Sequence, residues 1–166
     1  MKLLTLVRHA KSSWGHPELA DFERPLNKRG ERDAPRMGER LRSLDPPPDL
    51  LVSSPAIRAV TTARVIAAAI EYPEGEIELR PEIYEAGCFT LLTLIRDLPG
   101  HADHVMLFGH NPGFTDLANL LQPEPIDNVP TCGVVRMAFK VDSWTEIDEQ
   151  GGHLLDFDSP RKGRRE

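Results

Sequence analysis

Two histidines and two arginines of this chain stand at or just beyond the ends of short apolar runs: Arg8, His9, Arg58 and His110. The apolar runs cover residues 3–7, 50–52 and 105–108. A neutral imidazole is a nucleophile that can accept a phosphoryl group. A guanidinium group binds phosphate oxygens through paired N–H donors. These side chains therefore favour covalent phosphoryl-transfer chemistry, provided that the fold brings them together.

The apolar runs predict how these side chains could meet. Residues 3–7 and 105–108 show no alternation of polar and apolar positions, which is typical of strands buried on both faces of a parallel sheet. In open α/β sheets, the reaction site lies at the carboxyl ends of the strands. Arg8, His9 and His110 follow such ends, and Arg58 falls in the first turn of the helix expected after the run 50–52. We therefore expect all four side chains at one edge of a sheet.

The rest of the pattern predicts strands that alternate with helices. Further strands are expected over 76–79, 132–139 and 153–157, the last two at an edge or antiparallel. Helices are expected over about 28–44, 54–70 and 91–98 and from 111 onward, with these polar caps: Asn27, Ser54, Thr90 and Asn111. Pro35 predicts a late start or a kink in the first helix, and Ile57 and Ile70 are placed on the inward face of the second. The predicted class is α/β: a three-layer sandwich with a largely parallel central sheet flanked by helices.

Length and charge limit the possible partners. The chain has 166 residues, which is enough for one sizeable core, so we expect one domain over 1–160 and a basic tail over 161–166. The formal net charge of −6 argues against broad nucleic-acid binding, although a local cluster of arginine and histidine can still bind an anionic substrate. No run approaches the ~20 apolar residues of a membrane span. We expect no membrane partner and a cytoplasmic location.

Other residues with potential chemistry are interpreted as structural. Cys88 and Cys132 lack metal-site spacing and are expected to be buried free thiols. His101 and His104 form a close pair and are expected at the surface, in a loop. No acidic metal-binding signature accompanies the histidines and arginines, so we expect no metal and no cofactor.

Several segments together are similar to one known family. The stretch from Arg8 to Trp14 resembles the signature of the histidine phosphatase superfamily, whose usual form is Arg-His-Gly; here Ala10 replaces the glycine. Residues 53–62 resemble its second arginine motif, and residues 109–113 resemble its second histidine motif. Segments 24–30, 130–131 and 157–161 look most like the short SixA-like phosphohistidine phosphatases. The resemblance covers nearly the whole chain in the right order, and it implies a phosphoglycerate-mutase-like fold and phosphatase activity.

This resemblance and the residue chemistry imply the same roles. His9 is the candidate nucleophile, and a backbone carbonyl of the first loop, not identified from the sequence, is expected to hold its second ring nitrogen. Arg8, Arg58 and His110 are expected to bind the phosphoryl oxygens together with His9. The expected enzyme is a metal-independent phosphatase with a phosphohistidine intermediate.

The general acid stays open at this stage. Many members of the superfamily supply a glutamate, and the segment 81–87 offers Glu82 and Glu85. Glu82 lies nearer the family position, whereas Glu85 follows Tyr84 in a pattern similar to the short branch. Either could be a surface residue, and a phosphohistidine substrate has a good leaving group that does not require a dedicated acid.

Three functions fit this set of residues. The leading hypothesis is dephosphorylation of phosphohistidine on a protein, since the short chain leaves little room for insertions that would close the pocket around a small molecule. The second is a phosphatase or mutase-like transferase acting on small phosphate esters at the same site. The third is a catalytically silent phosphate-binding module. The oligomeric state is not predicted.

Overall fold

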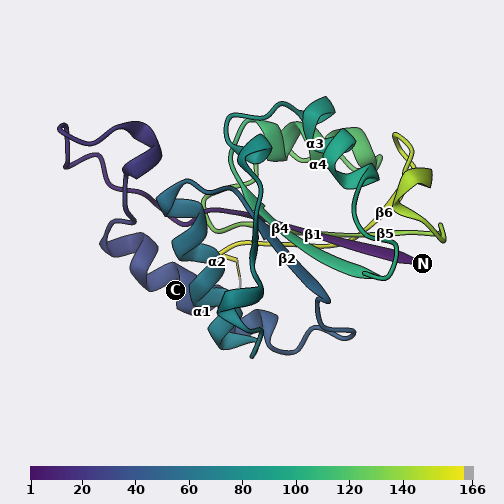
Figure 1. Ribbon diagram of the computed structural model, residues 1–166, viewed down its shortest axis with the longest axis horizontal. Helices are drawn as coiled ribbons and strands as arrows, with labels where there is room; N and C mark the ends of the chain where they lie inside the picture. Colours follow the sequence, from purple (N-terminus) through teal and green to yellow (C-terminus); the bar gives the residue numbers. More distant parts are fainter. Residues whose placement is uncertain (163–166) are drawn as a thin grey trace.

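A six-stranded sheet forms the centre of the protein in the computed structural model, which describes residues 1–162 (Figure 1). The strands are β1 (Lys2–Arg8), β2 (Leu50–Ser53), β3 (Glu78–Leu79), β4 (His104–Gly109), β5 (Val134–Phe139) and β6 (Gly152–Asp158). Their order across the sheet is β3-β2-β4-β1-β5-β6. The pairs β2–β3, β2–β4 and β1–β4 are parallel, whereas β1–β5 and β5–β6 are antiparallel. The prediction of a largely parallel sheet, with antiparallel pairing of the last strands, is therefore confirmed.

Helices cover both faces of this sheet. They are α1 (Lys28–Leu41), α2 (Ile57–Ala69), α3 (Cys88–Arg96) and α4 (Gly113–Leu121), joined by the short 3-10 turns η1 (Asp21–Glu23), η2 (Glu74–Glu76), η3 (Pro81–Ile83) and η4 (Trp144–Glu146). In Figure 1, α3 and α4 lie above the sheet and α1 and α2 lie below it. The predicted three-layer α/β sandwich is confirmed.

Burial on both faces explains why the strands do not alternate in polarity. In β4, Val105 and Leu107 pack in the core cluster that contains α3 and α4, whereas Met106 and Phe108 pack in the cluster that contains α1 and α2. Each of the four is fully buried. Successive side chains of a strand point to opposite faces, so a strand between two helical layers must be apolar throughout.

The sheet register aligns the ends of the strands that carry the predicted site. Arg8 pairs with Gly109, and Ser53 pairs with Phe108. Just beyond these pairs, His9 N–H donates to the carbonyl of Gly109 at 3.0 Å, and Ser54 N–H donates to the carbonyl of Phe108 at 3.0 Å. The carboxyl ends of β1, β2 and β4 therefore lie side by side, as the order of the motifs predicts.

The first helix begins where its cap predicts. Asn27 accepts a hydrogen bond from Gly30 N–H at 2.9 Å through its side chain, and α1 starts at Lys28. The expected late start at Pro35 is wrong, because the helix runs through that residue. It ends at Leu41, three residues before the predicted end at 44, in a turn that precedes the proline run.

Two other helix starts differ from the prediction. Helix α2 begins at Ile57 after a turn at Pro55, so Ile57 stands at the exposed start of the helix and not on its inward face. Ile70 lies half-buried just after the helix. Helix α3 begins earlier than expected, at Cys88 after Gly87, so Thr90 lies in its first turn and does not cap it.

Two predictions about side-chain exposure are also corrected. His104 is buried: its Nδ1 donates to the carbonyl of Pro46 at 2.8 Å, and its Nε2 lies 2.8 Å from Thr5 Oγ1. Strand pairing places it inside β4, and both ring nitrogens find partners there. Cys132 is buried as predicted, whereas Cys88 is only half-buried at the start of α3; both thiols are free.

The chain ends are described in part. Arg161 and Lys162 follow β6 in a turn, whereas residues 163–166 of the predicted basic tail lie outside the described residues. The division into a domain over 1–160 and a tail stays a prediction. No helix among residues 1–162 is both long enough and apolar enough to cross a membrane.

Close packing at Gly30 yields a test of how α1 holds the first loop. A Cβ atom at Gly30 would collide with the backbone carbonyl of Lys11, two residues after His9. We expect Gly30→Ala to lower the free energy of unfolding by ~1–3 kcal/mol, since overpacking against backbone forces the chain to shift. Gly75→Ala is the control, because nothing lies within 4 Å of its added atom. Urea unfolding of both variants measures the difference, and a Gly30→Ala variant as stable as the parent would contradict this packing.

Candidate active site

The structure brings three of the four predicted side chains into direct contact at the carboxyl ends of the strands. The rings of His9 and His110 lie with their centroids 5.2 Å apart, and Arg58 Nε lies 3.4 Å from His9 Nε2. All three are buried, with exposed fractions of 6–9%. Arg8 stands beside His9 at the end of β1, where its Nη1 donates to the carbonyl of Val129 at 2.9 Å. The predicted site therefore exists as a cluster.

Hydrogen bonding sets the tautomer of His9. Its Nδ1 lies 2.7 Å from the carbonyl oxygen of Ala10. A carbonyl only accepts, so Nδ1 carries the hydrogen and Nε2 keeps its lone pair, which accepts from Arg58 Nε at 3.4 Å. Burial is the main cause that lowers the pKa of His9 to about 3; the neighbouring His110, Arg58 and Arg8 add to this effect, and the hydrogen bond to Ala10 opposes it. The imidazole is therefore neutral at pH 7, with Nε2 available as a nucleophile.

The carbonyl that orients His9 is itself fixed by helix α2. Ala10 N–H donates to Thr62 Oγ1 at 2.9 Å, and the Thr62 hydroxyl donates to the carbonyl of Arg58 at 2.7 Å. Thr62 is fully buried. One helix thus carries Arg58 and also fixes the residue that orients His9, which couples the positions of the two groups.

His110 is held from the opposite side by the segment before α2. Its Nε2 lies 2.7 Å from Ser54 Oγ, which also accepts from Ala56 N–H at 3.2 Å. Burial lowers the pKa of His110 to about 4, and Arg58 is the next contributor. If the Ser54 hydroxyl donates to Nε2, the ring hydrogen lies on Nδ1, which becomes a donor.

Two atoms of this cluster lack partners. Among residues 1–162, four buried side-chain nitrogens have no hydrogen-bond partner, and they are Arg8 Nε, Arg36 Nη1, His110 Nδ1 and Arg136 Nε. Two of the four belong to the predicted site. Buried polar groups are nearly always satisfied, so an unpaired donor at a reaction site points to a bound acceptor. Phosphoryl oxygens are acceptors of this kind.

Three residues that the sequence motifs did not single out as catalytic join the cluster: Asp21 and Arg24 from the first loop, and Tyr84 after η3. The carboxylate of Asp21 accepts from Tyr84 Oη at 2.7 Å, from Arg58 Nη2 at 3.0 Å and from Arg24 Nε at 3.1 Å. The hydrogen bond from Tyr84, followed by the bond from Arg58, lowers the pKa of Asp21 to about 2. Asp21 lies in a polar loop with no periodicity, so its sequence context carried no signal. Tyr84 stood in the quoted segment 81–87 only as a neighbour of the glutamates.

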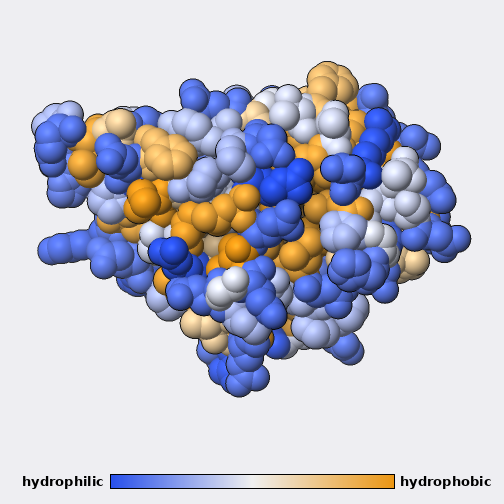
Figure 2. Space-filling view, in the orientation of Figure 1, coloured by the Kyte–Doolittle hydropathy of each residue, from blue (hydrophilic) through white to orange (hydrophobic). Residues whose placement is uncertain are grey.

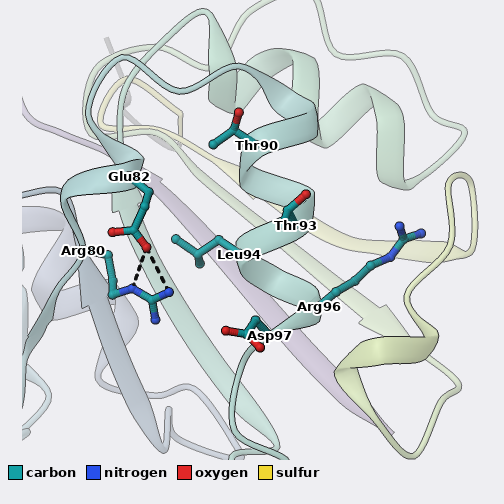
Figure 3. Close-up of a pocket in the computed structure, with 7 residues that line it drawn as sticks. All are labelled: Arg80, Glu82, Thr90, Thr93, Leu94, Arg96 and Asp97. Carbon is teal, nitrogen blue, oxygen red and sulfur yellow. Dashed lines mark hydrogen bonds and ion pairs between the residues drawn. The ribbon is translucent and has the colours of Figure 1, made fainter.

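The structure does not bring either predicted glutamate to His9. Glu82 lines a surface groove of about 500 Å³ between η3 and α3, where it turns toward Arg80 (Figure 3). Arg80 Nε donates to it at 3.0 Å. Its own backbone amide, and then Arg80, lower the pKa of Glu82. Glu85 lies exposed with a positive φ of 60°.

A comparison with protein families identifies the chain. Residues 4–111 match the model of the histidine phosphatase superfamily, branch 1, and this match covers more than half of the sequence. The chain belongs to the histidine phosphatase superfamily. The matched range contains His9, Arg58 and His110, and it makes the chain a phosphatase.

Solved structures similar to this phosphatase include SixA proteins. A protein from Agrobacterium tumefaciens assigned as the phosphohistidine phosphatase SixA is 28% identical, with a TM-score of 0.78 over 96% of this chain and 98% of that one. The protein histidine phosphatase SixA in complex with tungstate is 21% identical, with a TM-score of 0.75 over 95% of this chain and 97% of that one, and shows the same fold. The phosphatase is therefore SixA-like.

Sequence relatives extend over nearly the whole phosphatase. An uncharacterized chloroplastic protein of Arabidopsis thaliana is 30% identical over 164 residues, which cover 92% of this chain and 75% of that protein. An uncharacterized protein of Mycobacterium tuberculosis is 30% identical over 168 residues, which cover 93% of this chain and all of that protein.

The link between Thr62 and Ala10 yields a test of positioning. We expect Thr62→Val to lower kcat ~10-fold with little change in KM, because the hydroxyl no longer fixes the residue that orients His9. Thr62→Ser keeps the hydroxyl and should restore most of the rate. Thr5→Val removes a buried hydroxyl far from the site, where it contacts His104, and serves as the matched control. Steady-state kinetics decide, and a kcat equal to the parent in Thr62→Val would contradict this positioning role.

Proposed function

We propose that this phosphatase removes the phosphoryl group from a phosphohistidine residue of a protein and passes it to water through a phosphorylated His9. The observation that carries the proposal is the unprotonated His9 Nε2, whose lone pair accepts a 3.4 Å hydrogen bond from Arg58 Nε in a buried cluster. A neutral, oriented imidazole next to a guanidinium is suited to attack a phosphoryl group.

The two chemical steps balance without an added acid or base. In the first, the Nε2 lone pair forms a bond to phosphorus, and the substrate P–N bond breaks with its electrons going to the substrate ring nitrogen. The step starts from the protonated form of the substrate ring, in which the other nitrogen carries a hydrogen, so a neutral imidazole leaves. In the second, water attacks phosphorus, the P–Nε2 bond returns its electrons to His9, and the water hydrogens leave with the phosphate. In the first step, the phosphoryl group moves from one imidazole to another of the same type. The free energies of the reactant and the product of this step therefore differ little.

Arg8, Arg58 and His110 would stabilise the transferred group. Its transition state spreads negative charge over the equatorial oxygens. Arginine offers paired donors to such oxygens, and the unpaired Arg8 Nε and His110 Nδ1 are the atoms with free capacity. The proposed mechanism assigns no role to a metal or another cofactor, since this chain's own cationic side chains supply the charge.

The charge state of Asp21 supports a phosphohistidine substrate over an alkyl ester. Asp21 has a pKa of about 2 and is ionised at neutral pH, whereas Glu82 pairs with Arg80 away from His9. An alkyl ester needs a proton on its leaving oxygen as the bond breaks, and a general acid typically contributes ~10²–10⁴-fold there. The phosphohistidine leaving group described above needs none.

A substrate panel tests the proposal. We expect kcat/KM for a phosphohistidine-containing protein to exceed that for glycerol phosphate by at least ~10²-fold, because the alkyl leaving group lacks a proton donor.

Glu82→Gln should leave phosphohistidine turnover within about twofold of the parent, since this residue pairs with Arg80 away from His9. Activity should also survive exhaustive chelation.

Other results would support the alternative functions. Faster turnover of small esters or sugar phosphates than of phosphohistidine protein would favour a general phosphatase or a mutase-like transferase at the same site. Phosphate binding without turnover of any substrate would favour a silent binding module.

A further inference from the structure

A row of aromatic rings leads from the proposed nucleophile to the surface. The centroid distances are 5.2 Å from His9 to His110, 5.6 Å from His110 to Tyr84, and 5.1 Å from Tyr84 to Phe22. The last two contacts are edge-to-face. Burial decreases along the row, from 7% exposed at His9 to 37% exposed at Phe22. We call the outer part of this row, Tyr84 and Phe22, the aromatic wall.

Two separate segments of the chain build this wall. Phe22 lies in η1 of the first loop, and Tyr84 follows η3. The Tyr84 hydroxyl donates to Asp21 at 2.7 Å, which fixes the ring next to the carboxylate that accepts from Arg58. The wall thus joins the phosphoryl-binding cluster directly.

The loop that carries Phe22 also carries an exposed tryptophan. Trp14 is 74% exposed, and the guanidinium of Arg24 lies 3.6 Å from its ring centroid. In Figure 2, apolar side chains extend over this face from the loop of residues 11–27, at the left, toward the centre. Exposed aromatic side chains next to a reaction site are suited to binding a planar ring.

We propose that Phe22 and Tyr84 select the leaving group of the substrate by packing against a planar, cationic ring. This inference rests on the proposed function and adds to it the residues that recognise the imidazole of phosphohistidine. When its distal nitrogen is protonated, the phosphohistidine ring is positively charged before the P–N bond breaks. Aromatic faces attract such a cation.

The same wall disfavours other leaving groups. A sugar or glycerol group has hydroxyls that would lose water against the rings without gaining partners. Selectivity would then come from the leaving-group side, while Arg8, Arg58 and His110 bind the phosphoryl part common to all substrates.

Two small phosphoramidates isolate the contribution of the ring. N-phosphoimidazole and phosphoramidate both contain a P–N bond, but only the first has an aromatic leaving group. We expect Phe22→Leu to lower the ratio of their kcat/KM values, ring compound over ringless compound, by ~3–10-fold, the range measured for aromatic pairs. Phe22→Tyr keeps a ring and should preserve the ratio. Phe89→Leu is the matched control, because Phe89 is an exposed phenylalanine on α3 outside this row of rings.

The outcomes separate this inference from the proposed function. If Phe22→Leu loses activity equally on both compounds, or not at all, the wall does not select the leaving group and the inference is overturned, while the proposed function stands. If the parent protein hydrolyses neither compound nor a phosphohistidine protein, the proposed function is overturned and the inference with it. A lower ratio in Phe89→Leu would also contradict the inference, since the effect would not be specific to the wall.

Discussion

The hydrogen bond from His9 Nδ1 to the carbonyl of Ala10 sets the chemistry of this protein, because it decides which ring nitrogen keeps a lone pair. The carbonyl can orient the His9 ring only while the backbone at Ala10 keeps one conformation. Thr62 restrains this backbone by accepting a hydrogen bond from the Ala10 amide, and its own hydroxyl donates to the carbonyl of Arg58. One network therefore positions both His9, the proposed nucleophile, and Arg58, the proposed phosphate-binding arginine.

The fold serves this network by bringing three strand ends together. The parallel register of β1, β2 and β4 places His9, Ser54 and His110 beside one another before any side chain makes contact. Burial then keeps both imidazoles neutral, since the pKa of His9 falls to about 3 and that of His110 to about 4. Burying these polar side chains, two of whose nitrogens have no hydrogen-bond partner, costs free energy. A bound phosphoryl group would offset this cost by accepting hydrogen bonds from the unpaired nitrogens of Arg8 and His110.

Much of this arrangement could be predicted from the sequence, for identifiable reasons. Apolar runs without alternation predict buried strands, and an order of motifs at strand ends predicts a shared edge, so the α/β class and the gathering of His9, Arg58 and His110 followed. Contacts between distant loops could not be predicted in this way. Asp21 meets Tyr84 across 63 residues of sequence, and no local pattern marks either residue. Glu82 shows a different limit: its partner Arg80 is only two residues away, but the sequence does not show that this pair faces a surface groove, and its role as an acid stays a prediction.

The central claim is that His9 Nε2 attacks phosphorus, and the position of the trapped phosphoryl group tests it most directly. The protein would be mixed with a phosphohistidine substrate, quenched at alkaline pH, and digested, and the labelled ring would be identified by mass spectrometry and its nitrogen by phosphorus–proton NMR correlation. The account predicts label on His9 at Nε2 and none in His9→Ala. Label on His9 Nδ1, on His110 or on a carboxylate such as Asp21 would contradict it.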